Sequence, residues 1–419
     1  MENKCVITRV HDRLISAEFQ DSKCCDLHVF EESSIVNNIY VGRVENVVKN
    51  INSAFIEIQK GVKCYYSLED NKKHIFLNRK NSDKVNIGDL MLVQVIREPI
   101  KTKPATATSK IAMNGRYLVI SSDIKGIAIS AKVKKNEHCR ELRDIFNEHM
   151  EQWLADCNRE FGFILRTNSA NADIQDVLGE ADSLMKQFCD ILSKAEFAKA
   201  FTLMYKAPAG YIDKIKGIRG NSATEIITDD PDIYEEINMA LSNQNASSSC
   251  TAALAASTIT ARLYSDNLLS LQSLYSLETE ISRALAKKVW LKSGGYIVIE
   301  QTEALTVIDV NTGKQVSKKS GVDAKESTVA KANMEAAREI ARQMRLRNLS
   351  GIIIVDFINM EDDKNNSELM SCLRNLLRHD TLQSSVIDIT KLGLVEMTRK
   401  KSGKSLYEAW QGGSKAVTE

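Results

Sequence analysis

Residues 293–314 read SGGYIVIEQTEALTVIDVNTGK, and residues 351–360 read GIIIVDFINM. We expect the first stretch to form a hairpin that pairs GGYIVIEQ with ALTVIDV. The second stretch is apolar on both faces, which predicts a buried central strand. Between them, residues 333–348 have the spacing of a basic amphipathic helix that stops near Gly351. Residues 285–400 are therefore expected to form a compact α/β unit.

Each of the two predicted strands ends in an aspartate. Asp309 shares a face with Leu305 and Val307, and Asp356 follows a run of apolar residues. Desolvating a carboxylate is costly unless a cation or hydrogen bonds compensate, and two carboxylates at neighbouring strand ends suit a hard divalent cation. Asn311 would return to the same side and hydrogen-bond a metal-bound water or a phosphate. The pattern alone leaves open that each aspartate caps a helix or a turn.

The N-terminal third is rich in strands. Residues 1–38 alternate as a small antiparallel sheet would, and five short strands within residues 39–122 predict a small closed barrel. These five segments are IYVGRVENVV, SAFIEI, CYYSL, DLMLVQVIREP and GRYLVISS. Phe55, Tyr65 and Tyr66 lie on such strands near lysines, as in barrels that stack the bases of single-stranded nucleic acid. The alternative places Phe55 in the barrel core.

The pattern becomes helical over residues 137–205, with one strand-like piece from Phe161 to Arg166. There Arg166 and Thr167 leave a strand into a polar loop, where a guanidinium and a hydroxyl can hold a terminal phosphate; a plain surface pair is the alternative. Residues 217–240 return to a strand followed by a helix that opens at Pro231. Residues 242–257, SNQNASSSCTAALAAS, are expected to form an exposed loop.

Composition describes a soluble globular chain of 419 residues, with 43% hydrophobic and 26% charged residues and a net charge of +1. Local charge is uneven: residues 99–135 contain eight basic residues and one acidic residue, and residues 314–347 contain nine and four. Such blocks are either solvated faces or surfaces for a polyanion. The segment TRKKSGK at 398–404 is similarly a phosphate-contacting strip or a soluble tail. No apolar run is long enough to cross a membrane, and no signal peptide is apparent, so a cytoplasmic location is expected.

The nine cysteines form no C-x-x-C pair, so neither a disulfide framework nor a zinc site is expected and the thiols should be reduced. No glycine-rich phosphate loop is present, which argues against a nucleotide cofactor.

Three long motifs resemble the ribonuclease E/G family of bacterial endoribonucleases. They are SGGYIVIEQTEALTVIDVNTGK (293–314), NMEAAREIARQMRLRNLSGIIIVDF (333–357) and LGLVEMTRKKSGKSL (392–406). Weaker similarity is carried by IYVGRVENVVKNINSAFIEI and FILRT, so the resemblance extends to about residue 406.

The resemblance implies a mixed α+β and α/β chain of several subdomains. An RNase H-like subdomain is split into residues 1–38 and 217–284, with an OB-type RNA-binding barrel (39–122) and a 5′ sensor (123–216) inserted into it. A DNase I-like catalytic subdomain (285–400) and a basic C-terminal tail (401–419) follow.

The resemblance also implies roles for residues. Asp309 and Asp356 would coordinate Mg²⁺, with Mn²⁺ as an open alternative because an oxygen site accepts either, and Asn311 would assist. Arg166 and Thr167 would bind a 5′-monophosphate. The single-stranded RNA would contact the residues Phe55, Tyr65 and Lys103. The expected reaction is hydrolysis by a metal-activated water, which leaves 5′-phosphate and 3′-hydroxyl ends.

The sequence departs from the family at three places. Asn359 stands where the family often has aspartate, which would weaken the metal's surroundings without removing a ligand. The family's C-P-x-C zinc motif and its small C-terminal domain are missing, so a homo-oligomer stays open but zinc bridging is not expected. Two rivals follow: an RNA-binding protein of the same fold without catalysis, and a metal phosphodiesterase that acts on DNA or a small phosphoester.

Overall fold

The computed structural model describes residues 3–77, 83–99, 103–157, 159–218, 223–245, 259–313, 322–378 and 380–412. The chain divides into two compact units, one of residues 1–30, 225–230 and 262–419, the other of residues 31–224 and 231–261. The first therefore brings together segments about 200 residues apart in the chain, as a split subdomain would. The exact boundaries expected for the individual subdomains stay predictions.

The N-terminal strands β1, β2 and β3 pair antiparallel, as the alternation predicts, and belong to a five-stranded sheet of the first unit. Its order is β15-β14-β1-β2-β3, with β1 (Asn3–Val10), β2 (Arg13–Gln20), β3 (Lys23–Val29), β14 (Thr224–Thr228) and β15 (Ile259–Leu263). Two-residue turns join the first three strands, and all four turn residues have positive φ, as type I′ turns require: His11, Asp12, Asp21 and Ser22. The core beside this sheet includes residues of α5 (Leu271–Leu274), α6 (Leu277–Leu285) and α9 (Leu406–Gly412), together with Leu346. The described part of the predicted basic tail thus includes a packed helix.

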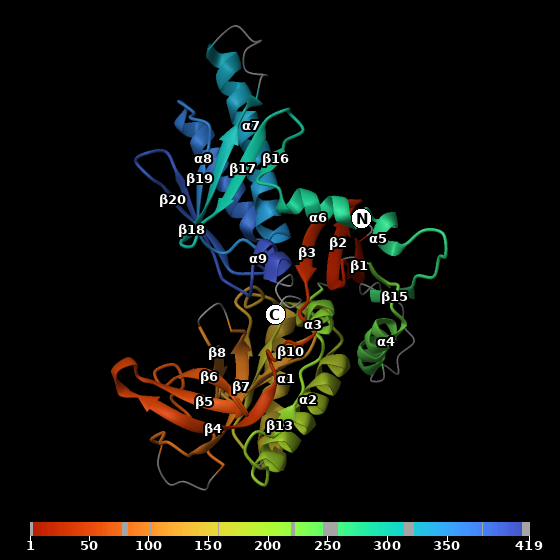
Figure 1. Cartoon of the computed structure of the whole chain (residues 1–419), viewed down its shortest axis with the longest axis vertical. Coiled ribbons are helices and arrows are strands. Elements are labelled where there is room, and N and C mark those ends of the chain that lie inside the picture. Colours follow the sequence, from red (N-terminus) through yellow and green to blue (C-terminus); the bar gives the residue numbers. More distant parts are fainter. Residues whose placement is uncertain are drawn as a thin grey trace. The chain divides into compact units, whose positions relative to one another are not determined.

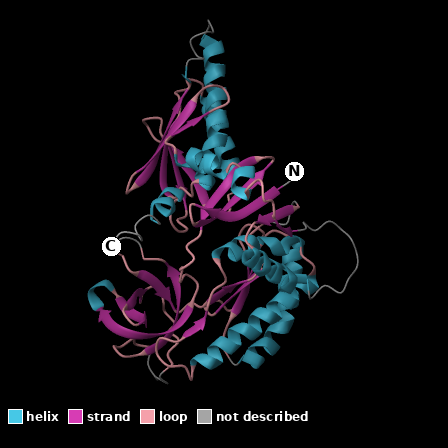
Figure 2. Cartoon of the chain, turned by 45° about the vertical axis from the view of Figure 1, so that its right-hand side comes forward, coloured by secondary structure: helices cyan, strands magenta, loops and turns pink. Residues whose placement is uncertain are grey.

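The second sheet of this unit has six strands in the order β16-β17-β18-β19-β21-β20. They are β16 (Lys288–Trp290), β17 (Tyr296–Gln301), β18 (Leu305–Asn311), β19 (Gly351–Asp356), β20 (Ser384–Ile389) and β21 (Val395–Arg399). The predicted hairpin is confirmed as β17 and β18, which pair antiparallel. The predicted basic helix is α7 (Val322–Leu346), which packs with α8 (Asp363–Arg378) against one face of the sheet (Figure 1 and Figure 2).

The other face of this six-stranded sheet is exposed. In β19, Ile353 and Val355 are fully buried under the helices, whereas Ile352 is 51% exposed. The prediction of a strand buried on both faces is therefore wrong, although β19 is central in the sheet. Because successive side chains of a strand alternate between faces, β18 likewise buries Thr306 and Ile308 and exposes Val307.

The second unit contains the predicted barrel, which closes through pairing of β4 with β7. Its five strands are β4 (Ile39–Val48), β5 (Ser53–Gln59), β6 (Val62–Ser67), β7 (Leu90–Arg97) and β8 (Ala105–Thr108), with η1 (Lys49–Ile51) after β4 and β13 (Leu203–Tyr205) paired to β4. The fifth strand is a correction: β8 completes the barrel, whereas GRYLVISS forms a strand of the neighbouring sheet. The short ATAT segment of β8 lacks the large β-branched residues that mark the other strands.

That neighbouring sheet has the order β11-β12-β10-β9 and is covered by two long helices. Its strands are β9 (Ala112–Asn114), β10 (Leu118–Ser121), β11 (Gly126–Ile129) and β12 (Gly162–Leu165), and the helices are α1 (Glu137–Cys157) and α2 (Ile174–Ala195). The turn η2 (Thr167–Asn171) follows β12, and α3 (Gly210–Lys216) and α4 (Pro231–Asn245) come later. The helical pattern, the predicted strand (as β12) and the helix opening at Pro231 are confirmed, whereas β13 is a second strand within residues 137–205 that the pattern did not predict. The predicted loop at 242–257 lies outside the described residues, except that α4 extends to Asn245.

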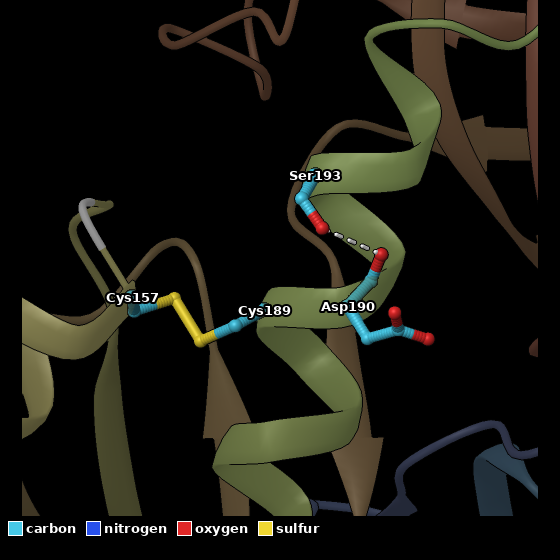
Figure 3. Close-up of a disulfide and its surroundings, with 4 residues drawn as sticks. All are labelled: Cys157, Cys189, Asp190 and Ser193. Atoms are coloured by element: carbon cyan, nitrogen blue, oxygen red, sulfur yellow. Dashed lines mark hydrogen bonds between the residues drawn. A yellow bond between two sulfur atoms is a disulfide. The ribbon is translucent and has the colours of Figure 1, made fainter.

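A disulfide joins Cys157, at the end of α1, to Cys189 in α2 (Figure 3). The expectation that all thiols are reduced is therefore wrong for this pair. Helices α1 and α2 pack together and place the two Cα atoms 5.3 Å apart across 32 residues of chain. Only the tertiary packing brings these cysteines together, so no local spacing could have signalled the bond.

None of the described helices has the length and apolar character needed to cross a membrane.

Candidate functional site

The two predicted metal-binding aspartates lie side by side on the exposed face of the six-stranded sheet. Asp309 and Asp356 are paired positions in the parallel register of β18 and β19. Paired side chains on neighbouring strands point to the same face about 5 Å apart. Both residues are exposed. The sheet therefore brings two carboxylates together where a ligand can reach them.

Asn311 joins this pair from the end of β18. Its side-chain Nδ2 donates a 2.6 Å hydrogen bond to Oδ2 of Asp309, which fixes one carboxylate oxygen. Among the described residues, neither Asp309 nor Asp356 accepts a hydrogen bond from a backbone N–H, so the structure gives no support to the alternative that the aspartates are caps. We refer to Asp309, Asn311 and Asp356 as the carboxylate cluster.

Two contacts that the sequence analysis missed hold the strand ends of the carboxylate cluster. Asn333 is fully buried on α7, where its Nδ2 donates to the carbonyl of Ile358 at 2.8 Å and its Oδ1 accepts from the Ile358 N–H at 3.1 Å. These two hydrogen bonds fix the position of the segment just after Asp356. Near the other strand end, Gly295 lies so close to the carbonyl of Asn311 that a Cβ would sit 2.6 Å from it. Asn333 could have been noticed in the sequence, because it is a polar residue on the apolar stripe of a predicted helix.

The donor set of the carboxylate cluster fits a hard divalent cation. Mg²⁺ binds oxygen ligands, keeps several waters, and is commonly held by one or two carboxylates together with substrate phosphates. No group of three or more His, Cys, Asp or Glu side chains that could hold a metal occurs among the described residues, so no closed protein cage is formed there. Two exposed carboxylates leave positions for water and a phosphate, which is the arrangement expected for Mg²⁺.

The barrel presents two of the three predicted rings on its outer surface. Tyr66 is fully buried in the barrel core, so the prediction that it stacks on bases is wrong. Phe55 and Tyr65 face each other across β5 and β6, with ring centroids 6.2 Å apart. Both rings are half-buried, and the residues on either side of Phe55 point into the core, so the alternative that Phe55 is a core residue is wrong. Ser53 donates a hydrogen bond to the Tyr65 hydroxyl at 2.7 Å. Lys103 is exposed just before β8, the strand that pairs with β6 beside Tyr65.

Arg166 and Thr167 connect β12 to the turn η2 and are both half-buried. The Arg166 backbone N–H donates to the Tyr117 carbonyl at 2.7 Å, and its guanidinium donates to the Gly115 carbonyl. Burial lowers the pKa of Arg166, while two nearby carboxylates, Glu180 and Asp213, oppose that shift. The guanidinium is thus held in place at the end of the strand by the β9–β10 turn.

Glu180 on α2 organises this turn, and the sequence analysis missed it. Its carboxylate accepts three backbone N–H groups, those of Arg116 at 2.6 Å, Tyr117 at 2.8 Å and Leu118 at 3.1 Å. Gly115 passes so close that a Cβ there would meet the Glu180 carboxylate at 2.5 Å. Burial raises the pKa of Glu180, and the three N–H groups oppose that shift. An acidic residue on the buried stripe of α2 was the signal for it.

Comparison with known proteins identifies the family of the chain. The model of the ribonuclease E/G family matches residues 112–402. The chain belongs to the ribonuclease E/G family. Ribonuclease G of Salmonella typhimurium is 30% identical over 91% of this chain and 76% of its own length, and a ribonuclease E/G-like protein of Pyropia yezoensis is 30% identical over 97% and 77%. Ribonuclease E of Synechocystis is 30% identical over 97% of this chain and 58% of its own length.

Two features of the family motifs take a definite place in the structure. Asn359, at the departure from the family pattern, is exposed three residues after Asp356, and its Oδ1 would lie 3.5 Å from a Cβ at Gly393. Arg399 of the basic segment is buried: it forms a bidentate ion pair with Asp380 and donates to the carbonyl of Leu349. Arg399 therefore cannot belong to a phosphate-contacting strip.

Proposed function

We propose that this chain cleaves single-stranded RNA with a Mg²⁺ ion held by Asp309 and Asp356. Membership of the ribonuclease E/G family makes the chain an endoribonuclease, a hydrolase that acts in RNA processing. The observation that carries the metal assignment is the in-register placement of the two aspartates on an exposed sheet face. Mn²⁺ would suit the same oxygen donors.

The residues of the carboxylate cluster have distinct tasks in this proposal. Mg²⁺ bound there would supply Lewis-acid chemistry and a water of lowered pKa. Asp309 and Asp356 would hold the ion at the scissile phosphate, and Asn311, which donates to Asp309, would fix the orientation of that carboxylate. Attack by water rather than by the ribose 2′-hydroxyl breaks the P–O3′ bond, so the products carry a 5′-phosphate and a 3′-hydroxyl.

The barrel and the sensor bind the same RNA strand at other points. Phe55 and Tyr65 offer ring faces to bases, and Lys103 offers a cation to the backbone, a combination that suits single strands. Arg166 and Thr167 hold a 5′-monophosphate, with the guanidinium donating to its oxygens. A pocket made for one phosphate disfavours a triphosphate, so a 5′-monophosphate stimulates cleavage.

The second candidate function is RNA binding without turnover, and Asn359 favours it. In that case RNA binding would be sensitive to salt, and no metal-dependent product would form. The intact carboxylate cluster favours catalysis instead, because nothing in simple RNA binding requires two adjacent carboxylates facing a polyanion.

The test uses one A/U-rich RNA oligonucleotide with either a 5′-monophosphate or a 5′-hydroxyl. Each form is incubated with the protein in Mg²⁺ or in EDTA, and the same DNA sequence serves as a substrate control. We expect cleavage of RNA only in Mg²⁺, and faster cleavage of the monophosphate form. Equal rates on the two RNA forms would remove the role of Arg166 and Thr167 but keep the nuclease. Binding without cleavage would support the second candidate.

A further inference from the structure

An exposed tryptophan and a half-buried tyrosine lie on the same sheet face as the carboxylate cluster. Trp290 of β16 is 65% exposed, and its ring centroid lies 5.4 Å from that of Tyr296 on β17, at an interplanar angle of 63°. Exposed tryptophans in folded chains commonly mark a binding surface, because the indole buries a large apolar area when it is covered. The family motifs and the proposed catalytic steps assign no task to this pair.

The strand register places the pair next to the carboxylate cluster. Trp290 pairs with Tyr296, and Tyr296 pairs with Asn311, so the three side chains lie in one row across β16, β17 and β18. Neighbouring strands are about 4.8 Å apart, so the Trp290 backbone is roughly 10 Å from that of Asn311. This is a distance that a strand of RNA covers within a nucleotide or two of the scissile phosphate.

A cation completes the arrangement. Lys288 lies two residues before Trp290, on the same face, with its Nζ 4.1 Å from the Trp290 ring centroid and 3.5 Å from that of Tyr296. Lys288 forms no ion pair with another described residue, so its charge is available to a ligand. A ring surface with an adjacent cation is what proteins use to hold a base and its phosphate in single-stranded nucleic acid. We refer to Trp290, Tyr296 and Lys288 as the aromatic platform.

We propose that the aromatic platform is a nucleobase subsite of the active site. A base near the scissile bond stacks on Trp290, Tyr296 supports the indole from its edge, and Lys288 contacts the phosphate of the stacked nucleotide. The proposal rests on the proposed function, because it takes the carboxylate cluster as the cleavage point. Stacking on a ring tolerates every base, so the subsite adds affinity and sets the position of the strand more than its sequence.

The experiment measures RNA affinity in EDTA, where no cleavage is expected, for wild type, Trp290→Ala, Trp290→Phe and Phe197→Ala. Phe197 is the matched control, since it is 83% exposed and lies in the other compact unit. The ligands are the intact oligonucleotide and a series in which each nucleotide near the mapped cleavage site is abasic in turn. Thermal unfolding of each variant checks its fold.

We expect Trp290→Ala to weaken binding about 5- to 150-fold, the range produced by loss of one base–aromatic stack, with a smaller loss for Trp290→Phe and none for Phe197→Ala. One abasic position should weaken wild type by a similar factor and leave Trp290→Ala unchanged. Equal RNA affinities of wild type and Trp290→Ala, with each abasic position weakening binding by the same factor in both proteins, would overturn the subsite. This is the result expected if the surface binds a protein partner instead.

Parallel cleavage assays in Mg²⁺ separate this proposal from the proposed function. If wild type cleaves RNA but binding does not depend on Trp290, the proposed role of the aromatic platform is wrong and the nuclease proposal stands. Trp290-dependent binding in a wild type that fails to cleave would keep the aromatic platform as an RNA site and remove the catalytic proposal. If Trp290→Ala fails to fold, the abasic series on Trp290→Phe decides between the same outcomes.

Discussion

The six-stranded sheet and the four-stranded sheet place their polar groups in opposite ways. In the six-stranded sheet, Asp309 and Asp356 project from an exposed face, while the core lies on the other side under α7 and α8. Beside the four-stranded sheet, Arg166 after β12 and Glu180 of α2 are largely enclosed and are held by backbone carbonyls and N–H groups. We therefore expect substitutions at the exposed carboxylates to leave the stability of the fold unchanged, whereas substitutions at Arg166 or Glu180 should lower it.

The largest expected effect concerns activity at the exposed site. Asp309→Asn and Asp356→Asn should each lower cleavage in Mg²⁺ by about 10³-fold or more, because each removes a carboxylate that we propose as a ligand of the ion. Their free energy of unfolding should change by less than about 0.5 kcal/mol, since both side chains are exposed. Asp388→Asn, an exposed aspartate on β20 of the same sheet, is the control and should keep full activity. Activity near wild type in both variants would refute the metal site.

The next effect is on stability within the same six-stranded sheet. Asp380 and Arg399 have side chains only 2% and 3% exposed, so removing one partner leaves a buried, unpaired charge. We expect Asp380→Ala to lower the free energy of unfolding by about 3–5 kcal/mol in chemical denaturation. The exposed pair of Lys287 with Glu300 is the control, and Glu300→Ala should cost about 1 kcal/mol or less.

The same ion pair predicts a pH dependence with a definite sign. Burial acts to raise the pKa of Asp380, but the hydrogen bonds from Arg399 and Ser384 outweigh it and hold the pKa below its ordinary value. A carboxyl whose folded pKa is lowered stabilises the fold above its unfolded pKa, and this contribution disappears as the pH falls through the folded value. The stability difference between wild type and Asp380→Asn should therefore be constant near neutral pH and shrink below about pH 4. A difference that grows in acid would contradict this sign.

In the second unit, the disulfide should matter for stability. Closing a loop of 32 residues between Cys157 and Cys189 restricts the unfolded chain, which contributes about 3–4 kcal/mol in the chain-entropy account. Cys157→Ser, or reduction of wild type, should lower the midpoint of thermal unfolding. Cys372→Ser changes a free cysteine and should leave it unchanged. Alkylation of both Cys157 and Cys189 in unreduced protein would show that the bond does not form.

The smallest expected effect concerns Glu180, where both the free energy of unfolding and the preference for a 5′-monophosphate should change. Glu180→Ala leaves the N–H groups of the β9–β10 turn without their acceptor, so we expect a loss of about 1–3 kcal/mol in unfolding free energy. The preference for a 5′-monophosphate should fall towards none, because that turn holds Arg166, while cleavage of the 5′-hydroxyl form stays intact. Glu148→Ala, on an exposed part of α1, is the control. An unchanged preference would separate Glu180 from the sensor.

Local patterns predicted most of the strands and helices. The hairpin of β17 and β18, the amphipathic helix α7 and the barrel follow from spacing, because each buries one face of a regular element. The carboxylate cluster was also accessible from sequence, since its aspartates end recognisable strands. β19 was judged buried on both faces because its residues are apolar, yet its burial depends on what covers the sheet.

The remaining features depend on contacts between distant segments. Glu180 acts on a turn more than 60 residues away, and Cys157 meets Cys189 only because α1 and α2 pack together. The barrel strand β8 was missed because its small residues carry little strand signal, and pairing with β6 and β7 defines it. The aromatic platform likewise becomes visible only when the register places Trp290 in a row with Asn311.

The most direct test of the central claim measures metal binding itself. Mn²⁺ is titrated into wild type, Asp309→Asn, Asp356→Asn and the control Asp388→Asn, and bound ion is followed by electron paramagnetic resonance. We expect a Mn²⁺ site in wild type and Asp388→Asn that is lost in the other two proteins and is displaced by excess Mg²⁺. Equal Mn²⁺ binding by all four proteins would contradict the assignment of Asp309 and Asp356 as the metal ligands.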